Sequence, residues 1–168
     1  MNYFTADLHF GHKNIIKYCN RPFNDEDEMD KTIINNWNGI VTARDTVYIL
    51  GDFTKIREPE VINAYLKKLN GNKVLILGNH DEFIKENSTL LNFSEVCDYK
   101  ELTIDGKKII LFHYPLLEWN DKKNGAICLH GHLHGKVKNV CNISGLFDVG
   151  VDANNFSPVS LEDILNSF

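Results

Sequence analysis

The chain has 168 residues and a formal net charge of -5 at pH 7, and a protein of this length buries roughly 70% of its unfolded surface in one core. Hydrophobic residues make up 43% and charged residues 24% of the sequence, which excludes a disordered, collagenous or disulfide-dense protein. No apolar run approaches the roughly 18 residues of a membrane helix, and no basic cluster indicates tight binding to nucleic acid or anionic lipid.

The first half of the chain alternates between short apolar runs and helical patterns. These patterns predict a strand over 2–6, helices over 13–19 and 26–40, a strand over 47–50, a helix over 58–69 and a strand over 73–77. Asp25 is placed to cap the second helix. The order strand, helix, strand indicates a parallel crossover. Gly51 and Gly78 therefore fall at the carboxyl ends of strands, where sites in α/β sheets gather.

The second half of the chain is richer in strand patterns. Runs over 99–104 and 107–113 flank Asp105 and Gly106, which predicts a hairpin. Further strands are predicted over 126–129, 136–142 and 146–149, and Ser160 with Asp163 forms a capping box that opens a helix over 160–166. No repeat or linker interrupts the chain. We therefore expect a single α/β domain over residues 1–168, with two sheets packed face to face and helices outside.

The cysteines and the N-terminus bear on location. The four cysteines, Cys19, Cys97, Cys128 and Cys141, show no CxxC spacing, so reduced and mostly buried thiols are expected. The first residues lack the basic stretch and long apolar run of a secretory signal. The sequence predicts a cytoplasmic protein with no membrane association.

All seven histidines lie in four short motifs. These are DLHFGH at 7–12, GNHD at 78–81, FHYP at 112–115 and HGHLHG at 130–135. A fifth motif, GDF at 51–53, places an aspartate at the same kind of strand end as the asparagine of GNHD. Neutral imidazoles and carboxylates are ligands for borderline divalent ions, and one carboxylate can span two ions. The sequence therefore contains the donors that a binuclear metal site requires.

The motifs DxH, GD, GNH, H and GHxH occur in this order between residues 7 and 134, and in this the chain resembles the calcineurin-like metallophosphoesterases. The resemblance implies a four-layer fold, a two-sheet β-sandwich flanked by helices. It also implies a ligand set in which Asp7, His9 and His134 hold one ion, Asn79, His113 and His132 hold the other, and Asp52 bridges them. Two divalent ions are expected, with Mn²⁺ favoured and iron, zinc, cobalt or nickel as alternatives.

The activity implied by the resemblance is hydrolysis of phosphomonoesters or phosphodiesters. Two cations roughly 3.5 to 4 Å apart stabilise charge on phosphoryl oxygens and lower the pKa of a bound water towards about 7. We therefore expect direct attack of a metal-bound hydroxide on phosphorus, without a phosphoenzyme. Little of the chain lies outside the motifs, which favours an open site and small phosphodiester substrates. Short oligonucleotides are an alternative class of substrate. The sequence does not indicate the oligomeric state.

His80 resembles the family histidine that faces the phosphate and protonates the leaving oxygen. Asp81 follows it directly and is expected to orient the ring through a hydrogen bond, which would raise the pKa of His80. These two residues form the predicted catalytic pair.

Five other polar residues lie near the motifs, and their roles are predicted separately. His12 is a candidate either for contact with the substrate phosphate or a metal ligand, or for helix entry. Arg21, one of three arginines, is a candidate either for clamping phosphate or for a solvated or packing role. His130 is expected to support the ligands or the fold. Asp148 and Asp152 lie in the stretch DVGVDANN and are expected to form turns.

Two other classes of function were considered. A non-catalytic binding protein could keep this fold after losing its chemistry, but such loss is expected to remove ligands, and every motif position is filled here. Nucleotide-binding folds are disfavoured because the chain contains neither GxGxxG nor GxxxxGK[ST].

Overall fold

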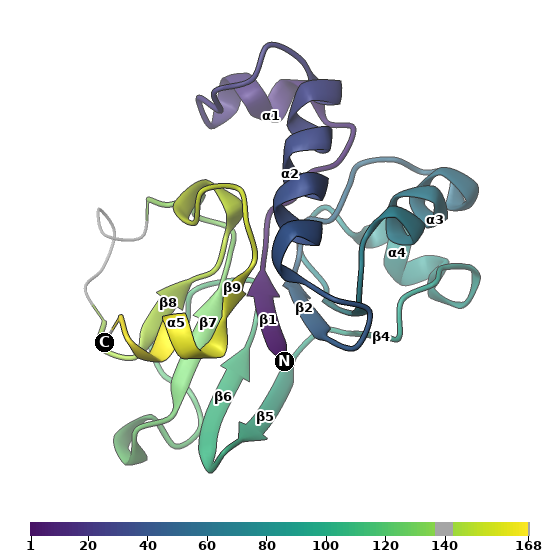
Figure 1. The fold of residues 1–168 in the computed structure, drawn as a ribbon. Coiled ribbons are helices and arrows are strands. Elements are labelled where there is room, and N and C mark those ends of the chain that lie inside the picture. Colours follow the sequence, from purple (N-terminus) through teal and green to yellow (C-terminus); the bar gives the residue numbers. More distant parts are fainter. Residues whose placement is uncertain (137–142, 168) are drawn as a thin grey trace.

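Two β-sheets lie face to face with helices on the outside in a computed structural model, which describes residues 1–136 and 143–167 (Figure 1). This arrangement confirms the predicted fold class. Of the strand expected over 136–142, Lys136 is not in a strand and residues 137–142 lie outside the described part. In the described residues, no helix has both the length and the apolar character to cross a membrane.

The first sheet has five strands in the order β4-β3-β2-β1-β9. Their bounds are β1 Asn2–Thr5, β2 Thr46–Leu50, β3 Asn72–Ile76, β4 Glu95–Cys97 and β9 Val159–Ser160. Strands β1 to β4 pair in parallel, and β9 pairs antiparallel to β1. Helix α3, Pro59–Lys68, connects β2 to the parallel strand β3. The predicted crossover is confirmed.

The second sheet has four strands in the order β5-β6-β7-β8. Their bounds are β5 Lys100–Ile104, β6 Lys107–Leu111, β7 Ile127–His130 and β8 Leu146–Asp148. Ile104 pairs with Lys107, and both turn residues, Asp105 and Gly106, have positive φ. Both are left-handed because a two-residue hairpin of this kind requires it, so the hairpin is confirmed.

The remaining helices are short except for one. They are α1 Lys13–Tyr18, α2 Glu26–Ile40, α4 Glu82–Glu86 and α5 Leu161–Leu165, with 3₁₀ turns at Ser88–Leu90, Lys122–Asn124 and Val151–Ala153. Asp25 accepts a hydrogen bond from Glu28 N at 2.9 Å, and Ser160 accepts one from Asp163 N at 3.1 Å. Both predicted caps are present. They supply partners for N–H groups that the first turn of a helix leaves free.

Apolar side chains fill two layers. Phe4, Leu50 and Leu129 belong to the cluster between the two sheets, while Ile33 and Trp37 of α2 pack on the other face of the first sheet. The carboxyl ends of the parallel strands in both sheets meet at one end of the sandwich, because Ala6 bridges to Gly150 in parallel and Gly131 N donates to His113 O. Figure 1 shows β1, β6 and β7 pointing the same way. The motif loops are therefore brought together.

Candidate metal centre

Five of the parallel strands, β1, β2, β3, β6 and β7, each end in a loop that carries one of the motifs. The loop after β1 holds residues 7–12, those after β2 and β3 hold 51–54 and 77–81, and those after β6 and β7 hold 112–115 and 131–135. Backbone hydrogen bonds fasten neighbouring loops together, because Asp7 N donates to Gly51 O and His9 N to Asp52 O, each at 3.0 Å. The backbone that carries the motif side chains is therefore fixed by hydrogen bonds between neighbouring loops.

Five of the seven predicted ligands have a left-handed backbone. They are Asp7, His9, Asp52, His132 and His134, with φ between 48° and 69°. A residue with a Cβ pays about 1–2 kcal/mol for this conformation. Such strain persists only where surrounding contacts fix it, and it gathers at functional sites. The loops are therefore shaped for the direction of these side chains rather than for local stability.

Two glycines let the loops approach one another closely. A Cβ on Gly78 would lie 2.4 Å from Asp52 Oδ1, and a Cβ on Gly131 would lie 2.4 Å from the Cβ of Ala6 and 2.8 Å from Asp7 Oδ2. Both separations are shorter than van der Waals contact. These positions accept only glycine if the two aspartates keep their places.

The first predicted ligand set comes together as expected. One donor atom from each of Asp7, His9 and His134 lies within 4.8 Å of the others. Asp7 and His9 are 0% and 1% exposed, and His9 Nε2 has no hydrogen-bond partner among the described residues. His134 Nδ1 is held by Asp152 Oδ2 at 2.7 Å, which leaves Nε2 as the ring nitrogen available to an ion. A ligand histidine braced by a carboxylate is a common arrangement in metal sites.

The second predicted set lies beside the first. His113 is fully buried, its Nδ1 lies 2.8 Å from Leu50 O, and its Nε2 lies 3.0 Å from Asn79 Oδ1. The backbone carbonyl fixes the tautomer in which Nδ1 carries the proton, so the lone pair of Nε2 faces Asn79. The ring of His132 lies 5.1 Å from that of His113. All three predicted side chains therefore converge.

Asp52 lies between the two sets. Its Oδ2 is 3.5 Å from His9 Nε2 of the first set, and its Oδ1 is 3.7 Å from His113 Nε2 of the second. The carboxylate is buried, and Oδ1 also accepts a hydrogen bond from His80 N at 2.9 Å. The position is that of a carboxylate able to contact two ions at once.

The electrostatics of this cluster fit bound cations. Burial raises the pKa of Asp7 well above its usual range; the charge of His134 opposes this shift, and Asp52 and Asp148 reinforce it. Burial also lowers the pKa of His9 far below its usual value, so its ring is neutral and free to coordinate. Buried carboxylates beside the neutral His9 imidazole, whose Nε2 has no hydrogen-bond partner among the described residues, form a donor set that a divalent ion completes. The residues present therefore fit the metal that their motifs predict.

His80 and Asp81 differ from their predicted relationship. Asp81 accepts hydrogen bonds from Asp52 N, Phe53 N and Gly78 N at 2.7 to 3.0 Å and none from the His80 ring. The expectation that Asp81 orients His80 is wrong, because its carboxylate is used in fastening the loops after β2 and β3. His80 Nε2 instead lies 4.0 Å from Asp52 Oδ2. Burial lowers the pKa of His80 and Asp52 opposes this shift, so the structure does not show the expected increase.

Arg21 is not a free substrate clamp. Its side chain is 0% exposed, and its guanidinium donates two hydrogen bonds to Asp152 at 2.8 Å. It also donates to the carbonyls of Asp7 at 2.7 Å and Leu8 at 3.2 Å. The proposed contact with substrate phosphate is therefore wrong, and the packing alternative holds: Arg21 supports the loop that carries Asp7 and His9.

Replacing Arg21 with glutamine is expected to lower the free energy of unfolding by about 3–5 kcal/mol, because it removes one of the two ionic partners of the buried Asp152 and leaves only His134. Urea unfolding measures this change. Arg44→Gln is the control, since Arg44 is exposed and a surface change costs about 0.5 kcal/mol or less. If Arg21→Gln had normal stability but a raised KM, the hypothesis that Arg21 binds the substrate phosphate would be supported after all.

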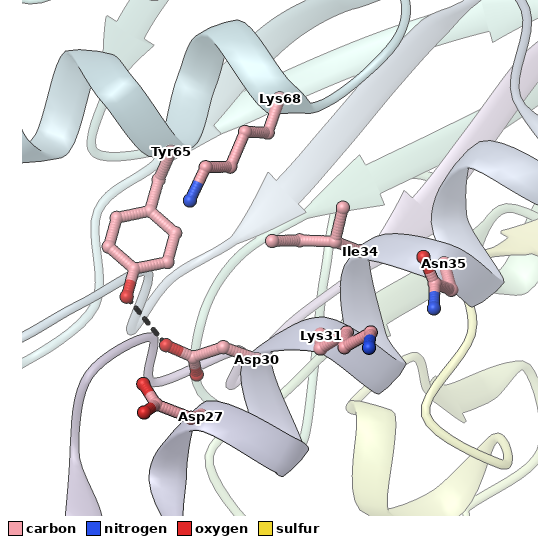
Figure 2. Close-up of a pocket in the computed structure, with 7 residues that line it drawn as sticks. All are labelled: Asp27, Asp30, Lys31, Ile34, Asn35, Tyr65 and Lys68. Atoms are coloured by element: carbon pink, nitrogen blue, oxygen red, sulfur yellow. Dashed lines mark hydrogen bonds between the residues drawn. The ribbon is translucent and has the colours of Figure 1, made fainter.

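Asp152 and Asp30 are supporting residues that the sequence did not reveal. Asp152 lies in the 3₁₀ turn Val151–Ala153, in agreement with the prediction of a turn, and its side chain in addition joins Arg21 to His134. Asp30 on α2 accepts hydrogen bonds from Gly11 N at 2.9 Å and from the Tyr65 hydroxyl of α3 at 2.6 Å. Figure 2 shows Tyr65 and Asp30 meeting at a pocket of about 260 Å³ between these helices. Asp30 thus fixes the backbone midway between His9 and His12.

The remaining histidines lie near the centre. His12 Nδ1 is 3.5 Å from His9 Nδ1, and its residue is half-buried at the start of α1, so both of its predicted roles stay predictions. His130 is fully buried at the end of β7, with Nδ1 2.8 Å from Gly131 O. Asp148 accepts from Gly150 N and Gly135 N, which agrees with its predicted role in a turn.

Comparisons with known proteins agree with this geometry. The family model for calcineurin-like phosphoesterases matches residues 3–151. An uncharacterized protein, MJ1445, of Methanocaldococcus jannaschii is 35% identical over 97% of this chain and 88% of its own. The Gene 66 protein of Mycobacterium phage L5 is 29% identical over 79% of this chain and 76% of its own. A crystal structure of a protein of unknown function from Aquifex aeolicus matches with a TM-score of 0.77 and 30% identity, covering 100% of this chain and 99% of that one.

Proposed function

This chain belongs to the calcineurin-like phosphoesterase family and is a metal-dependent phosphoesterase, and from that premise we propose that it holds two divalent ions and hydrolyses phosphodiesters. The observation that carries the proposal is the place of Asp52, whose two carboxylate oxygens face His9 and His113 from different ligand sets. A single buried carboxylate in that position is suited to bridging a pair of ions.

We assign Asp7, His9 and His134 to one ion, Asn79, His113 and His132 to the other, and Asp52 to both. The mixture of imidazole, carboxylate and amide donors suits manganese, and we propose Mn²⁺. When bound, two such ions neutralise charge on the phosphoryl oxygens and lower the pKa of a water molecule. The openness of the centre supports small diesters, because Asn79 and His80 are both exposed.

The chain's own residues perform the rest of the reaction. His80 Nε2 faces the centre, 4.0 Å from Asp52 Oδ2, and is placed to give a proton to the leaving oxygen. The backbone N–H of His80 donates a hydrogen bond to Asp52 Oδ1. This bond fixes the position of the proposed acid relative to the proposed bridging carboxylate. An anionic substrate beside the ring favours its protonated form. Asp81 keeps the two loops in place rather than moving a proton.

Metal removal and return test this function. Protein treated with EDTA is expected to hydrolyse neither bis(4-nitrophenyl) phosphate nor 4-nitrophenyl phosphate, and Mn²⁺ should restore turnover with higher kcat/KM for the diester. Metal analysis of the same samples should give two ions per chain. Two bound ions without turnover would indicate a non-catalytic protein of this fold, and one ion per active chain would contradict the binuclear centre.

A further inference from the structure

A cleft of about 290 Å³ opens beside the candidate metal centre. It is lined by residues 54–57 of the loop after β2, by Asn79 and His80 of the loop after β3, and by the first three residues of α4, 82–84. Asn79 and His80, which we assigned to metal binding and proton transfer, form part of its wall. A group bound in this cleft therefore lies next to the bond that is broken.

The segment after β2 places two cations at the cleft. Thr54 Oγ1 donates to Phe10 O at 2.7 Å and accepts from Ile56 N at 3.0 Å. Ile56 packs inward against Gly11, where an added Cβ would lie 2.8 Å from Ile56 Cδ1. Lys55 and Arg57, on either side of Ile56, are exposed and line the cleft. Their backbone is fixed by its neighbours, while their charged ends are free to meet a ligand.

These two cations, Lys55 and Arg57, form no ion pair with any residue in the described part of the chain. The carboxylate of Glu58 accepts a hydrogen bond from the backbone N of Arg57 rather than from its guanidinium. Glu82 is the single acidic residue of the cleft wall. In a chain of net charge -5, an excess of positive charge at this point indicates an anionic ligand.

Resting on the proposed diesterase function, we propose that this cleft binds a second phosphate group, carried on the leaving-group side of the substrate, through Lys55 and Arg57. The side follows from His80, because the residue that protonates the leaving oxygen lines the same cleft. Arg57 suits a bidentate contact with phosphate, and Lys55 supplies a point charge. The substrate class is a phosphodiester whose leaving group carries a further phosphate, as in a phosphorylated dinucleotide.

Binding of substrate-like nucleotides, in which the reacting phosphate is still joined to the leaving nucleoside, tests the cleft without requiring turnover. Calorimetry with the Mn²⁺-loaded protein compares thymidine 5′-phosphate with thymidine 3′,5′-bisphosphate. We expect the bisphosphate to bind about 10-fold more tightly, which is the effect of one additional charge-assisted contact. The double variant Lys55→Gln/Arg57→Gln should lose this advantage. The matched control, Arg44→Gln/Lys123→Gln, removes the same two charges from exposed sites that precede β2 and β7 and should keep it.

The outcomes separate this inference from the proposed function. Equal affinity for both nucleotides, or an advantage that survives Lys55→Gln/Arg57→Gln, overturns the cleft assignment even if bis(4-nitrophenyl) phosphate is hydrolysed. An advantage that also disappears in the Arg44→Gln/Lys123→Gln control would show only a dependence on net charge and overturns it as well. An advantage specific to Lys55 and Arg57 in a protein that hydrolyses no diester supports the cleft and refutes the diesterase function.

Discussion

Asp52→Asn is expected to lower kcat by on the order of 10³-fold or more, since removing even one stabilising group from an active site costs roughly 10²–10³-fold. Asparagine has the shape of aspartate, and its Oδ1 still accepts the hydrogen bond that His80 N donates at 2.9 Å. What disappears is the negative charge between His9 and His113. The variant should therefore fold normally while its metal content falls from two ions per chain to one or none.

Metal analysis, thermal melting and diester turnover on one preparation test this expectation. Asp98→Asn is the matched control, because Asp98 is a surface carboxylate whose side chain is 71% exposed. This substitution should leave all three measurements unchanged. If Asp52→Asn kept two ions and most of its turnover, the bridging role would be refuted. If the variant failed to fold, rather than folding with fewer bound ions, Asp52 would be shown to have a mainly structural role.

The helices and strands predicted correctly have either a pattern that extends over several residues or a local signal in the sequence, such as the capping box that opens α5 or the short apolar run of β8. The helix at 26–40 was predicted with both ends correct, because its apolar residues repeat over four turns and Asp25 caps it. The hairpin at Asp105 and Gly106 was equally clear, since its turn chemistry is local. By contrast, α4, β4 and β9 were missed. They have five, three and two residues, which is too short for any periodicity, so tertiary contacts decide their structure.

The candidate site divides in a similar way. The seven predicted ligands could be recognised because each lies in a short motif of histidine, aspartate, asparagine and glycine, and the structure gathers them at one end of the sandwich. Supporting contacts could not be predicted, because they join distant positions. Arg21 and Asp152 are 131 residues apart, and Asp30 reaches Gly11 across 19 residues. Asp81 follows His80 directly, and that proximity in sequence suggested a hydrogen bond that the fold directs elsewhere.

Left-handed backbone at the ligands could not have been predicted from local preference. Positive φ is uncommon in residues other than glycine, although aspartate and histidine adopt it more readily than most, and Asp7, His9 and Asp52 all have it. The cause is the requirement that side chains from separate loops face one point, together with backbone hydrogen bonds from Asp7 N and His9 N that fix the loops. Stability is lower at these positions so that the donors converge, which is the usual relation between strain and function.

His80→Ala is expected to show a strong dependence on the leaving group. With an unactivated dinucleotide such as thymidylyl thymidine, the leaving alkoxide needs a proton, and loss of the general acid should lower kcat by about 10²–10⁴-fold. With bis(4-nitrophenyl) phosphate, the stable 4-nitrophenolate leaves without one, and the loss should be several-fold at most. The imidazole of His80 makes no hydrogen bond to the other described residues, so two ions per chain should be retained.

The matched comparison is His12→Ala, which removes another histidine close to His9. Because His12 is predicted to contact the substrate phosphate or a metal ligand rather than the leaving group, its loss should affect both esters by a similar factor. A His80→Ala protein that hydrolyses the dinucleotide as fast as the wild type would eliminate proton donation by His80. Equal losses on both substrates would assign His80 to phosphate binding instead, because a group that stabilises the phosphoryl oxygens acts independently of what departs.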